Sequence, residues 1–426
     1  VYLTKARIIR AIAKKIILFL AQLEDFQKKL FLKKKFVVET QYCITLDRIP
    51  QSFYSEVASN DKQREEWVRL FSIDEIHPAE GELQTQTSYS SPLTVDFLKE
   101  NQNLVLDTKF FSKDFKERLI DSIENLDESL DGLLIHSENF QALNLLQAKY
   151  KKKIDCCYID PPYNTGNDDF LYKDNYSHSS WLSMINDRFS LAYKLLKKSG
   201  WCSIDIDDNE LFNLEKLFET SLWSSVTNIT VKMSHLSGMK MGHIEKKLPK
   251  LKESILLLSK GNDYKLNPIY EPCSWEDAFE RYTSWVDFHD SEDPSKWTRK
   301  TLRQAAKENK INVNNIDEFS EFCIKNANHI FQRAKNDSVT DFPHDGVFYS
   351  YTTPNGLKKI VLDAKEVLFA SNYLKEINGV ITPTIPKGDI WDDIGINNAH
   401  NEGGVQLENG KKPVKLFERL IDLTTN

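Results

Sequence analysis

Residues 154–163 read IDCCYIDPPY, and this stretch determines the fold class that the 426-residue sequence predicts. Its first part, Ile154 to Ile159, is an apolar run with the length of a short buried strand. The strand must end at Asp160, because the two prolines that follow cannot donate hydrogen bonds to a sheet. We therefore expect an acidic side chain at the carboxyl end of this strand.

The regions on both sides of this strand repeat one pattern, in which a short apolar run is followed by an amphipathic helix. We expect strands at residues 133–135, 154–159 and 201–206, and a helix from about 181 to 198 that Gly200 terminates. Asp207 and Asp208 then cap a further helix. Strands that alternate with helices form right-handed parallel crossovers. The sequence thus predicts a doubly wound, mostly parallel α/β sheet.

Three polar clusters follow the predicted strands, at residues 137–139, 160–163 and 205–208. The carboxyl ends of parallel strands share one edge of a sheet, and ligands bind at that edge. Asp205, Asp207 and Asp208 look like a metal cluster, but helix capping explains them better, and the nine histidines show no ligand spacing. We therefore expect one site at this edge that holds no metal.

The composition is typical of a soluble globular protein, with 40% hydrophobic residues, 28% charged residues and a net charge of −7. A polyanionic partner would have to bind at local basic patches. The densest basic run contains Lys28, Lys29 and Lys33–Lys35, for which a solvated helix face is the favoured interpretation and a phosphate-contacting patch the alternative. The apolar stretch at residues 8–23 contains two lysines and predicts no membrane span. Six cysteines without a C-x-x-C pair indicate a reducing cytoplasm.

Residues 160–163 resemble the D-P-P-Y motif of amino-group DNA methyltransferases, which transfer a methyl group from S-adenosylmethionine to an exocyclic nitrogen of adenine or cytosine. Such an amine is a poor nucleophile, because its lone pair is delocalised into the ring. The carboxylate of Asp160 and the carbonyl of Pro161, which the proline ring holds in a restricted backbone, would accept its two N–H groups, and Pro162 is the next catalytic residue of the motif. Tyr163 would stack on a base that has left the duplex.

Further segments are similar to the Mod methylation subunits of type III restriction–modification systems. They are residues 170–174, 179–184, 203–210, 253–260, 387–391 and 409–413. Their order, with the catalytic motif ahead of the cofactor half, is that of the β class of these enzymes. The resemblance implies methylation of adenine N6 in double-stranded DNA, with N4 of cytosine as the alternative. Further partners compatible with it are a restriction (Res) subunit and a second copy of the chain, in a homodimer.

The same resemblance assigns cofactor contacts to Ser137, Asn139, Tyr163 and Lys412. One part of the family pattern is missing, namely a methionine-binding turn of the type aromatic-x-Gly-x-Gly, because no two of the fifteen glycines have G-x-G spacing. In the family this turn comes shortly after the helix that corresponds to residues 412–424. We therefore expect that the chain is truncated before this turn. A non-catalytic DNA-binding remnant is the alternative function.

Four regions are expected along the chain. Residues 1–125 form a helical N-terminal region with a basic patch, and residues 126–261 form the catalytic half of the methyltransferase domain. Residues 262–380 form an inserted α+β target-recognition region, and residues 381–426 return to the catalytic domain and begin its cofactor half. The expected DNA contacts are Lys33, Lys34, Lys35, Lys240, Arg299 and Lys300.

Overall fold

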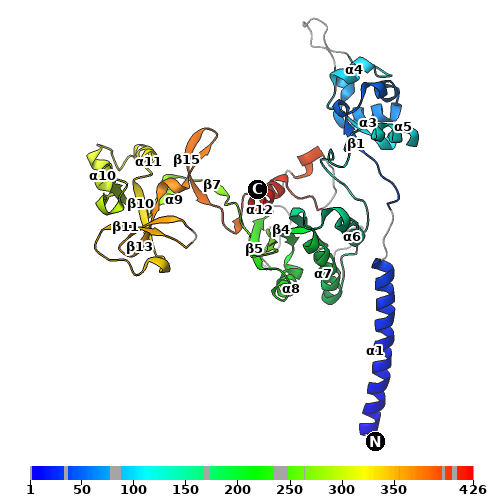
Figure 1. The fold of residues 1–426 in the computed structure, drawn as a ribbon, viewed down its shortest axis with the longest axis horizontal. Coiled ribbons are helices and arrows are strands. Elements are labelled where there is room, and N and C mark those ends of the chain that lie inside the picture. The colour runs from blue at the N-terminus through cyan, green and yellow to red at the C-terminus, as the bar shows by residue number, and fades with distance from the viewer. Residues whose placement is uncertain are drawn as a thin grey trace. The chain divides into compact units, whose positions relative to one another are not determined.

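The computed structural model describes the chain except for residues 1, 33–36, 77–87, 167–172, 235–247, 263, 355, 396–398, 405–409 and 426. The chain forms two compact units, residues 1–146 and 147–426 (Figure 1). No helix within the described residues is both long enough and apolar enough to cross a membrane.

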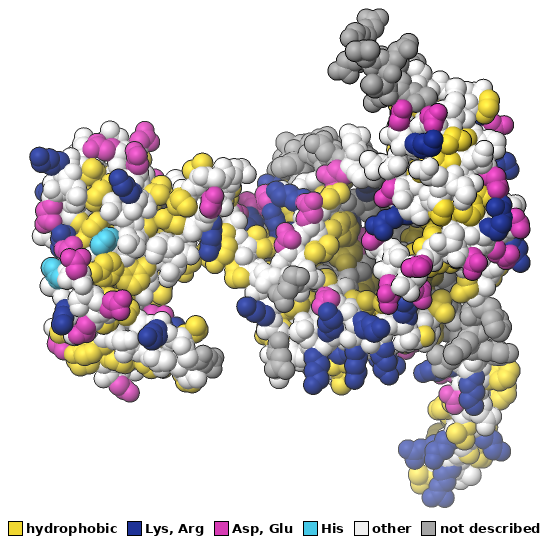
Figure 2. Space-filling model, turned by 45° about the horizontal axis from the view of Figure 1, so that its top comes forward, with side chains coloured by type: hydrophobic (Ala, Val, Ile, Leu, Met, Phe, Trp, Pro, Cys, Tyr) yellow, Lys and Arg dark blue, Asp and Glu magenta, His cyan; other side chains and the backbone are white. Residues whose placement is uncertain are grey.

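The N-terminal unit is mainly helical. Its helices are α1 (Tyr2–Leu32), α2 (Tyr54–Ala58), α3 (Asp61–Phe71), α4 (Val95–Glu100) and α5 (Lys113–Asp121). Two short antiparallel strands, β1 (Cys43–Thr45) and β2 (Val105–Asp107), lie beside a core that includes Leu46, Trp67, Phe97 and Phe115. Every described side chain of α1 is exposed, and Figure 2 shows basic and apolar side chains together along this helix.

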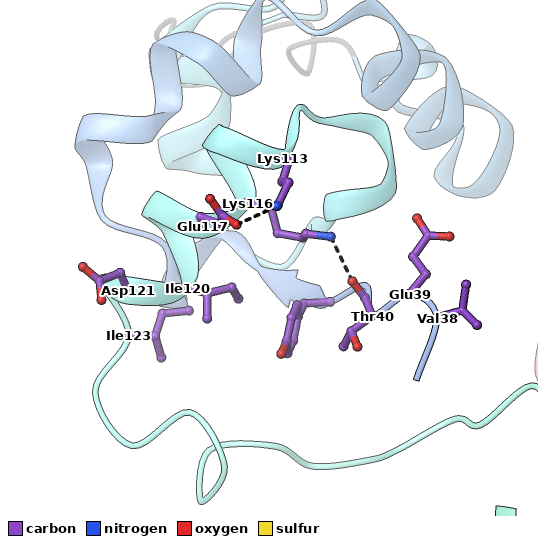
Figure 3. Close-up of a pocket in the computed structure, with 10 residues that line it drawn as sticks. Val38, Glu39, Thr40, Lys113, Lys116, Glu117, Ile120, Asp121 and Ile123 are labelled. Carbon is purple, nitrogen blue, oxygen red and sulfur yellow. Dashed lines mark hydrogen bonds and ion pairs between the residues drawn. The ribbon is translucent and has the colours of Figure 1, made fainter. Parts of the chain in front are cut away.

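The N-terminal unit also contains a cavity between residues 38–42 and α5 (Figure 3). Lys116 donates a hydrogen bond across it to the backbone oxygen of Thr40, at 3.0 Å. On its rim Lys113 pairs with Glu117 at 3.5 Å. Residues 160–163 belong to the other unit, so this cavity contains none of the residues that the sequence marks for catalysis.

The second unit is built on a five-stranded sheet with the strand order β16-β5-β6-β4-β3. Its strands are β3 (Ile154–Ile159), β4 (Leu196–Ile206), β5 (Ser225–Lys232), β6 (Lys252–Ser259) and β16 (Ile390–Trp391). β3 pairs parallel with β4, and β16 pairs parallel with β5, whereas β6 is antiparallel to both of its neighbours. Four of the five strands therefore run in one direction, and β6 runs against them.

Helices cover both faces of this sheet. They are α7 (His178–Leu195), α8 (Asp208–Glu219) and α12 (Val414–Thr424), whereas α6 (Asn139–Tyr150) contains the boundary between the two units. On one face Trp181 of α7 and Leu214 of α8 pack with Ile204 of β4. On the other face Leu416 of α12 packs with Trp201 of β4. The α/β class and the helices on both faces are thus as expected. The sheet is mixed and not mostly parallel, because β6 forms antiparallel pairs with both β4 and β5, which are two of the four strand pairings.

Two local predictions were wrong. Residues 133–135 form no strand, and Leu134 is 97% exposed, so this run buries too little apolar surface to hold it in a sheet. The helix predicted for 181–198 begins at His178 and ends at Leu195. Gly200 lies inside β4, where an added Cβ would be 3.1 Å from the carbonyl of Lys197. This glycine therefore permits close packing in a strand and does not terminate a helix.

Antiparallel strands dominate the segment between β6 and β16. One sheet has the order β11-β12-β13-β10-β8-β9 and a smaller one the order β14-β15-β7. The strands are β7 (Tyr270–Pro272), β8 (Ser284–Asp287), β9 (Thr298–Thr301), β10 (Ile330–Ala334), β11 (Phe348–Thr352), β12 (Lys358–Leu362), β13 (Lys365–Phe369), β14 (Leu374–Ile377) and β15 (Val380–Pro386). Three helices accompany them, α9 (Trp275–Phe279), α10 (Leu302–Glu308) and α11 (Ile316–Lys325). Trp275 and Trp285 are buried in the core of this segment.

Candidate active site

Three acidic residues meet at one edge of the five-stranded sheet. Asp160 follows the last residue of β3, and Asp205 lies next to the last residue of β4. Glu253 is at the start of β6, opposite Val231 near the end of β5. Because β6 runs against its neighbours, its first residues lie at the edge where the other strands end. The carboxylates of all three residues therefore lie around one point.

The ammonium group of Lys412, two residues before α12, occupies this point. Its Nζ lies 2.6 Å from Glu253 Oε2, 3.0 Å from Asp205 Oδ2 and 3.9 Å from Asp160 Oδ1. Only 8% of the Lys412 side chain is exposed, against 34% for Asp160. Among the described residues, three carboxylates thus surround this buried ammonium group, which leaves a surplus of negative charge around it.

Two tyrosines complete this cluster. Lys412 donates a hydrogen bond to the hydroxyl of Tyr163 at 2.5 Å, and its Nζ lies 5.0 Å from the centre of the Tyr163 ring. The Tyr163 hydroxyl is also 3.2 Å from Glu253 Oε2, and that of Tyr158 donates to Asp205 Oδ2 at 3.0 Å. Burial, and then the charge of Asp205, raises the pKa of both tyrosines. Both therefore stay neutral donors.

Burial also controls the acidic groups. It raises the pKa of Asp205 from its ordinary 3.8 to about 6, although the charge of Lys412 opposes this rise. It likewise raises the pKa of Asp160 against the charge of Lys412. Burial by itself would lower the pKa of Lys412, but the carboxylates of Asp205, Asp160 and Glu253 raise it. Asp205 Oδ1 is buried and has no hydrogen-bond partner among the described residues.

The raised pKa of Asp205 predicts how stability depends on pH. The folded state holds this proton more tightly than the unfolded state, so the contribution is complete below about pH 4 and is lost as the pH rises through 6. The loss amounts to about 3 kcal/mol at most. In urea unfolding from pH 4 to 8, the stability of Asp205→Asn should rise relative to the wild type by up to this amount. If the stability of Asp205→Asn and of the wild type changed with pH in the same way, this assignment would be contradicted.

The backbone after Asp160 is held by Trp181 of α7. The indole Nε1 of Trp181 donates a hydrogen bond to the carbonyl of Pro162 at 2.8 Å. This carbonyl is therefore engaged within the protein. Pro161 is buried beside it, and the side chain of Asp160 remains partly open to solvent. Asp160 and the carbonyl of Pro161 are thus the acceptors of the motif that remain for a ligand.

The structure brings Asp160, Pro161, Pro162, Tyr163 and Lys412 together. Glu253, Tyr158 and the ionic role of Asp205 were missed as parts of the site. The sequence predicts that an acidic residue at the start of β6 belongs to the site only if this strand is known to be antiparallel to its neighbours. Ser137 and Asn139 belong to the N-terminal unit, with Asn139 the first residue of α6, and their cofactor role stays a prediction.

The prediction that Asp207 caps a helix is confirmed. Its side chain accepts a hydrogen bond from the backbone N–H of Asn209 at 3.0 Å, at the start of α8. Asp207 also pairs with Lys250, and Asp208 pairs with Lys252 at 2.7 Å. The described residues contain no group of three or more His, Cys, Asp or Glu side chains arranged to hold a metal ion.

The expected DNA contacts include two residues that pair within the protein. Arg299 lies 3.4 Å from Asp363, and Lys300 lies 2.9 Å from Asp287 and 2.5 Å from Glu308. Lys33, Lys34, Lys35 and Lys240 lie outside the described residues. A DNA-binding role of these six residues stays a prediction.

Several known proteins resemble this chain. The probable type III restriction-modification enzyme HindVI Mod subunit of Haemophilus influenzae is 29% identical over 353 residues, which are 69% of this chain and 44% of that protein. The StyLTI Mod subunit of Salmonella typhimurium, a type III enzyme, is 35% identical over 116 residues, which are 21% of this chain and 18% of that protein. The type II methyltransferase M.KpnI of Klebsiella pneumoniae is 36% identical over 111 residues, or 24% of this chain and 26% of that protein. The chain thus spans less than half the length of these relatives.

Among solved structures, the cytosine-N4-specific PvuII DNA methyltransferase matches 30% of this chain and 49% of its own, with 13% identity and a TM-score of 0.24. The M1.HpyAVI–SAM complex matches 32% of this chain and 57% of its own, with 16% identity and a TM-score of 0.23. The model of a family described as DNA methylase, covering N6 and N4 enzymes, matches residues 154–426, from the first residue of β3 onward. This range is more than half of the chain and contains every residue of the cluster around Lys412. The chain therefore belongs to the DNA methylase family.

Proposed function

We propose that this protein, in a form that includes the methionine-binding turn, transfers a methyl group from S-adenosylmethionine to N6 of an adenine that has left the DNA duplex. The observation that carries the proposal is the placement of Asp160 and Tyr163 at the end of β3, beside the buried cluster around Lys412. Membership of the DNA methylase family supports the same chemistry.

The residues at the end of β3 would prepare the amine for attack. The carboxylate of Asp160 would accept one N–H group and the carbonyl of Pro161 the other, since the carbonyl of Pro162 is bound to Trp181. Hydrogen bonds to these two acceptors reduce the delocalisation of the nitrogen lone pair into the ring, which makes the nitrogen more nucleophilic. Burial raises the pKa of Asp160, which favours this carboxylate as the acceptor of the proton that the methylated amine loses.

Tyr163 would support the flipped base from one side. Its hydroxyl is bound by Lys412 and Glu253, so the ring has a fixed orientation before any base arrives. Stacking of a base on an aromatic ring is worth about 1–3 kcal/mol. Fixing the ring in advance reduces the entropy cost of capturing the base.

The charges of the site fit S-adenosylmethionine, which supplies the methyl group on a positively charged sulfur. Among the described residues, the carboxylates of Asp160, Asp205 and Glu253 surround the ammonium of Lys412, and Asp205 Oδ1 has no hydrogen-bond partner there. A surplus of buried negative charge favours a cationic ligand. Tyr163 and Lys412 would contact this cofactor, and Ser137 and Asn139 are its further proposed contacts.

Two alternatives remain to be separated by experiment. An N4-cytosine methyltransferase would use the same two acceptors, and the choice of adenine rests on Asp, instead of Ser, at position 160. A non-catalytic DNA-binding remnant would lack cofactor binding. Calorimetric titration of the full-length protein with S-adenosylmethionine, followed by transfer of a tritium-labelled methyl group to DNA, separates enzyme from remnant. Absence of both binding and transfer would contradict the proposed function.

We further propose that the protein works in a type III restriction–modification system, because several of its relatives carry the name of a Mod subunit. A restriction subunit encoded beside it would then be its partner. Co-expression of the two proteins with a tag on one of them should yield a complex that survives gel filtration. Separate elution of both proteins would count against this partner.

The N-terminal basic run predicts the salt dependence of DNA binding. Lys28 and Lys29 lie in α1 with exposed side chains. If they contact phosphates, neutralising both with glutamine should lower the slope of log K against log salt by about 0.9 for each contact. The exposed Lys113→Gln of α5 is the control, for which we expect an unchanged slope. An unchanged slope in the double variant would assign these lysines to a solvated helix face.

A further inference from the structure

Hydrogen bonds to both the backbone and the side chain of Asn164 hold the turn that follows Tyr163. Asn164 has a φ of 56°, in the left-handed region that L-residues seldom adopt. Its backbone N–H donates to Asp174 Oδ1 at 2.7 Å, and its Oδ1 accepts from the backbone N–H of Tyr176 at 2.6 Å. Its Nδ2 donates to the carbonyl of Tyr176 at 3.0 Å and to Glu210 Oε1 at 2.6 Å. Both its backbone and its side chain are therefore fixed.

Glu210, in the first turn of α8, is the buried carboxylate to which the side chain of Asn164 donates. It is 0% exposed. Its Oε1 accepts from Asn164 and lies 2.7 Å from Nδ1 of His178, and its Oε2 accepts from Asn213 Nδ2 at 2.7 Å. Burying a carboxylate is costly unless donors surround it, and the N-terminus of a helix favours negative charge. These contacts satisfy the carboxylate and direct one of its oxygens at Asn164.

Two other side chains hold the neighbouring backbone. The carboxylate of Asp174, which is 5% exposed, accepts hydrogen bonds from the backbone N–H of Thr165 at 3.0 Å and from its hydroxyl at 2.5 Å. Trp181 binds the carbonyl of Pro162. Residues 160–166, the catalytic turn, are therefore fixed on both sides of Tyr163 by side chains that take no part in the cluster around Lys412.

We propose that Glu210 is a positioning residue that acts through Asn164 to hold the catalytic turn in the geometry required for methyl transfer. This inference rests on the function proposed above and goes beyond it, because Glu210 touches neither Asp160 nor Tyr163 in the contacts of the described residues. Its effect reaches the reacting groups through the backbone of the turn. A displacement of about 1 Å at a reacting group is enough to cost about 10²-fold in rate.

The test compares Glu210→Gln with Glu219→Gln in the full-length protein. Both changes replace a carboxylate by an amide on α8, and Glu219 is exposed at the end of this helix. In Glu210→Gln one acceptor becomes an N–H donor that faces the donors of Asn164, His178 or Asn213. We expect kcat to fall by roughly 10–100-fold in Glu210→Gln, with unchanged KM for DNA, unchanged cofactor affinity and an intact circular dichroism spectrum. Glu219→Gln should keep the wild-type kcat.

A second variant separates positioning from a merely structural role. Asn164→Gly removes the amide that Glu210 holds, and glycine accepts the positive φ without strain. If Glu210 acts through Asn164, Asn164→Gly should lower kcat to a similar extent, and the double variant should lose little more than either single variant. Additive losses would overturn the proposal. Wild-type kcat in Asn164→Gly would also overturn it, whether or not Glu210→Gln folds. If the wild-type protein itself transfers no methyl group, the proposed function fails instead.

Discussion

Replacement of Asp160 by alanine should abolish most methyl transfer and leave DNA affinity nearly unchanged. Asp160 lies at the end of β3 with about a third of its side chain exposed, so its carboxylate can meet a ligand. As an acceptor that acts on the amine during attack, it contributes more to the transition state than to binding. We expect kcat to fall by about 10²–10³-fold, measured by transfer of a labelled methyl group.

The control for this variant is Asp155→Ala, which removes an exposed carboxylate of the same strand that pairs with Lys197 on the surface. It should keep nearly wild-type turnover. DNA affinity, followed by fluorescence anisotropy at fixed salt, should be equal in the wild type and in both variants. Asp160→Ala with a near wild-type rate would show that the amine is not held by this carboxylate.

The second large effect concerns stability. In Lys412→Met the ammonium that lies among these three carboxylates is lost, while the apolar stem of the side chain is kept. Removing one partner of a buried ionic cluster leaves uncompensated charge and costs about 3–5 kcal/mol. The free energy of unfolding in urea at pH 8 should fall by this amount. The deficit should shrink as the pH falls from 8 to 6, because loss of the Lys412 charge raises the pKa of Asp205 further and protonation of Asp205 removes part of the repulsion.

Lys415→Met is the matched control on α12. Lys415 pairs with Asp393 at 2.6 Å, but more than half of its side chain is exposed. Exposed ion pairs contribute about 0–1 kcal/mol, so this variant should lose far less stability than Lys412→Met. Equal losses in the two variants, or a deficit in Lys412→Met that does not change with pH, would contradict the ionic cluster as described.

Local sequence signals were sufficient to predict the strand that ends before Asp160 and the helix cap at Asp207. The first depends on prolines that cannot continue a ladder, and the second on a side chain that accepts from its own backbone two residues on. Both are properties of a few consecutive residues. Lys412 was found only through the resemblance to a family, because its partners in the cluster, Glu253 among them, are at least 150 residues away in the sequence.

Properties that depend on distant pairing could not be predicted. The direction of β6 is set by its two antiparallel neighbours, and this direction brings Glu253 to the catalytic edge. The apolar run 133–135 has the composition of a strand, yet Leu134 is almost fully exposed. Gly200 looked like a helix terminator, but it lies in β4, where an added Cβ would be 3.2 Å from the carbonyl of Asp155 in the neighbouring strand β3. In each case tertiary contacts decide among conformations that the local sequence permits.

The most direct test of the central claim is identification of the base that the protein modifies. Plasmid DNA that lacks prior methylation is incubated with the full-length protein and S-adenosylmethionine, digested to nucleosides and analysed by mass spectrometry, with Asp160→Ala in parallel. We expect N6-methyladenine from the wild type and almost none from the variant. N4-methylcytosine, unmodified DNA from the wild type, or equal yields from both proteins would contradict it.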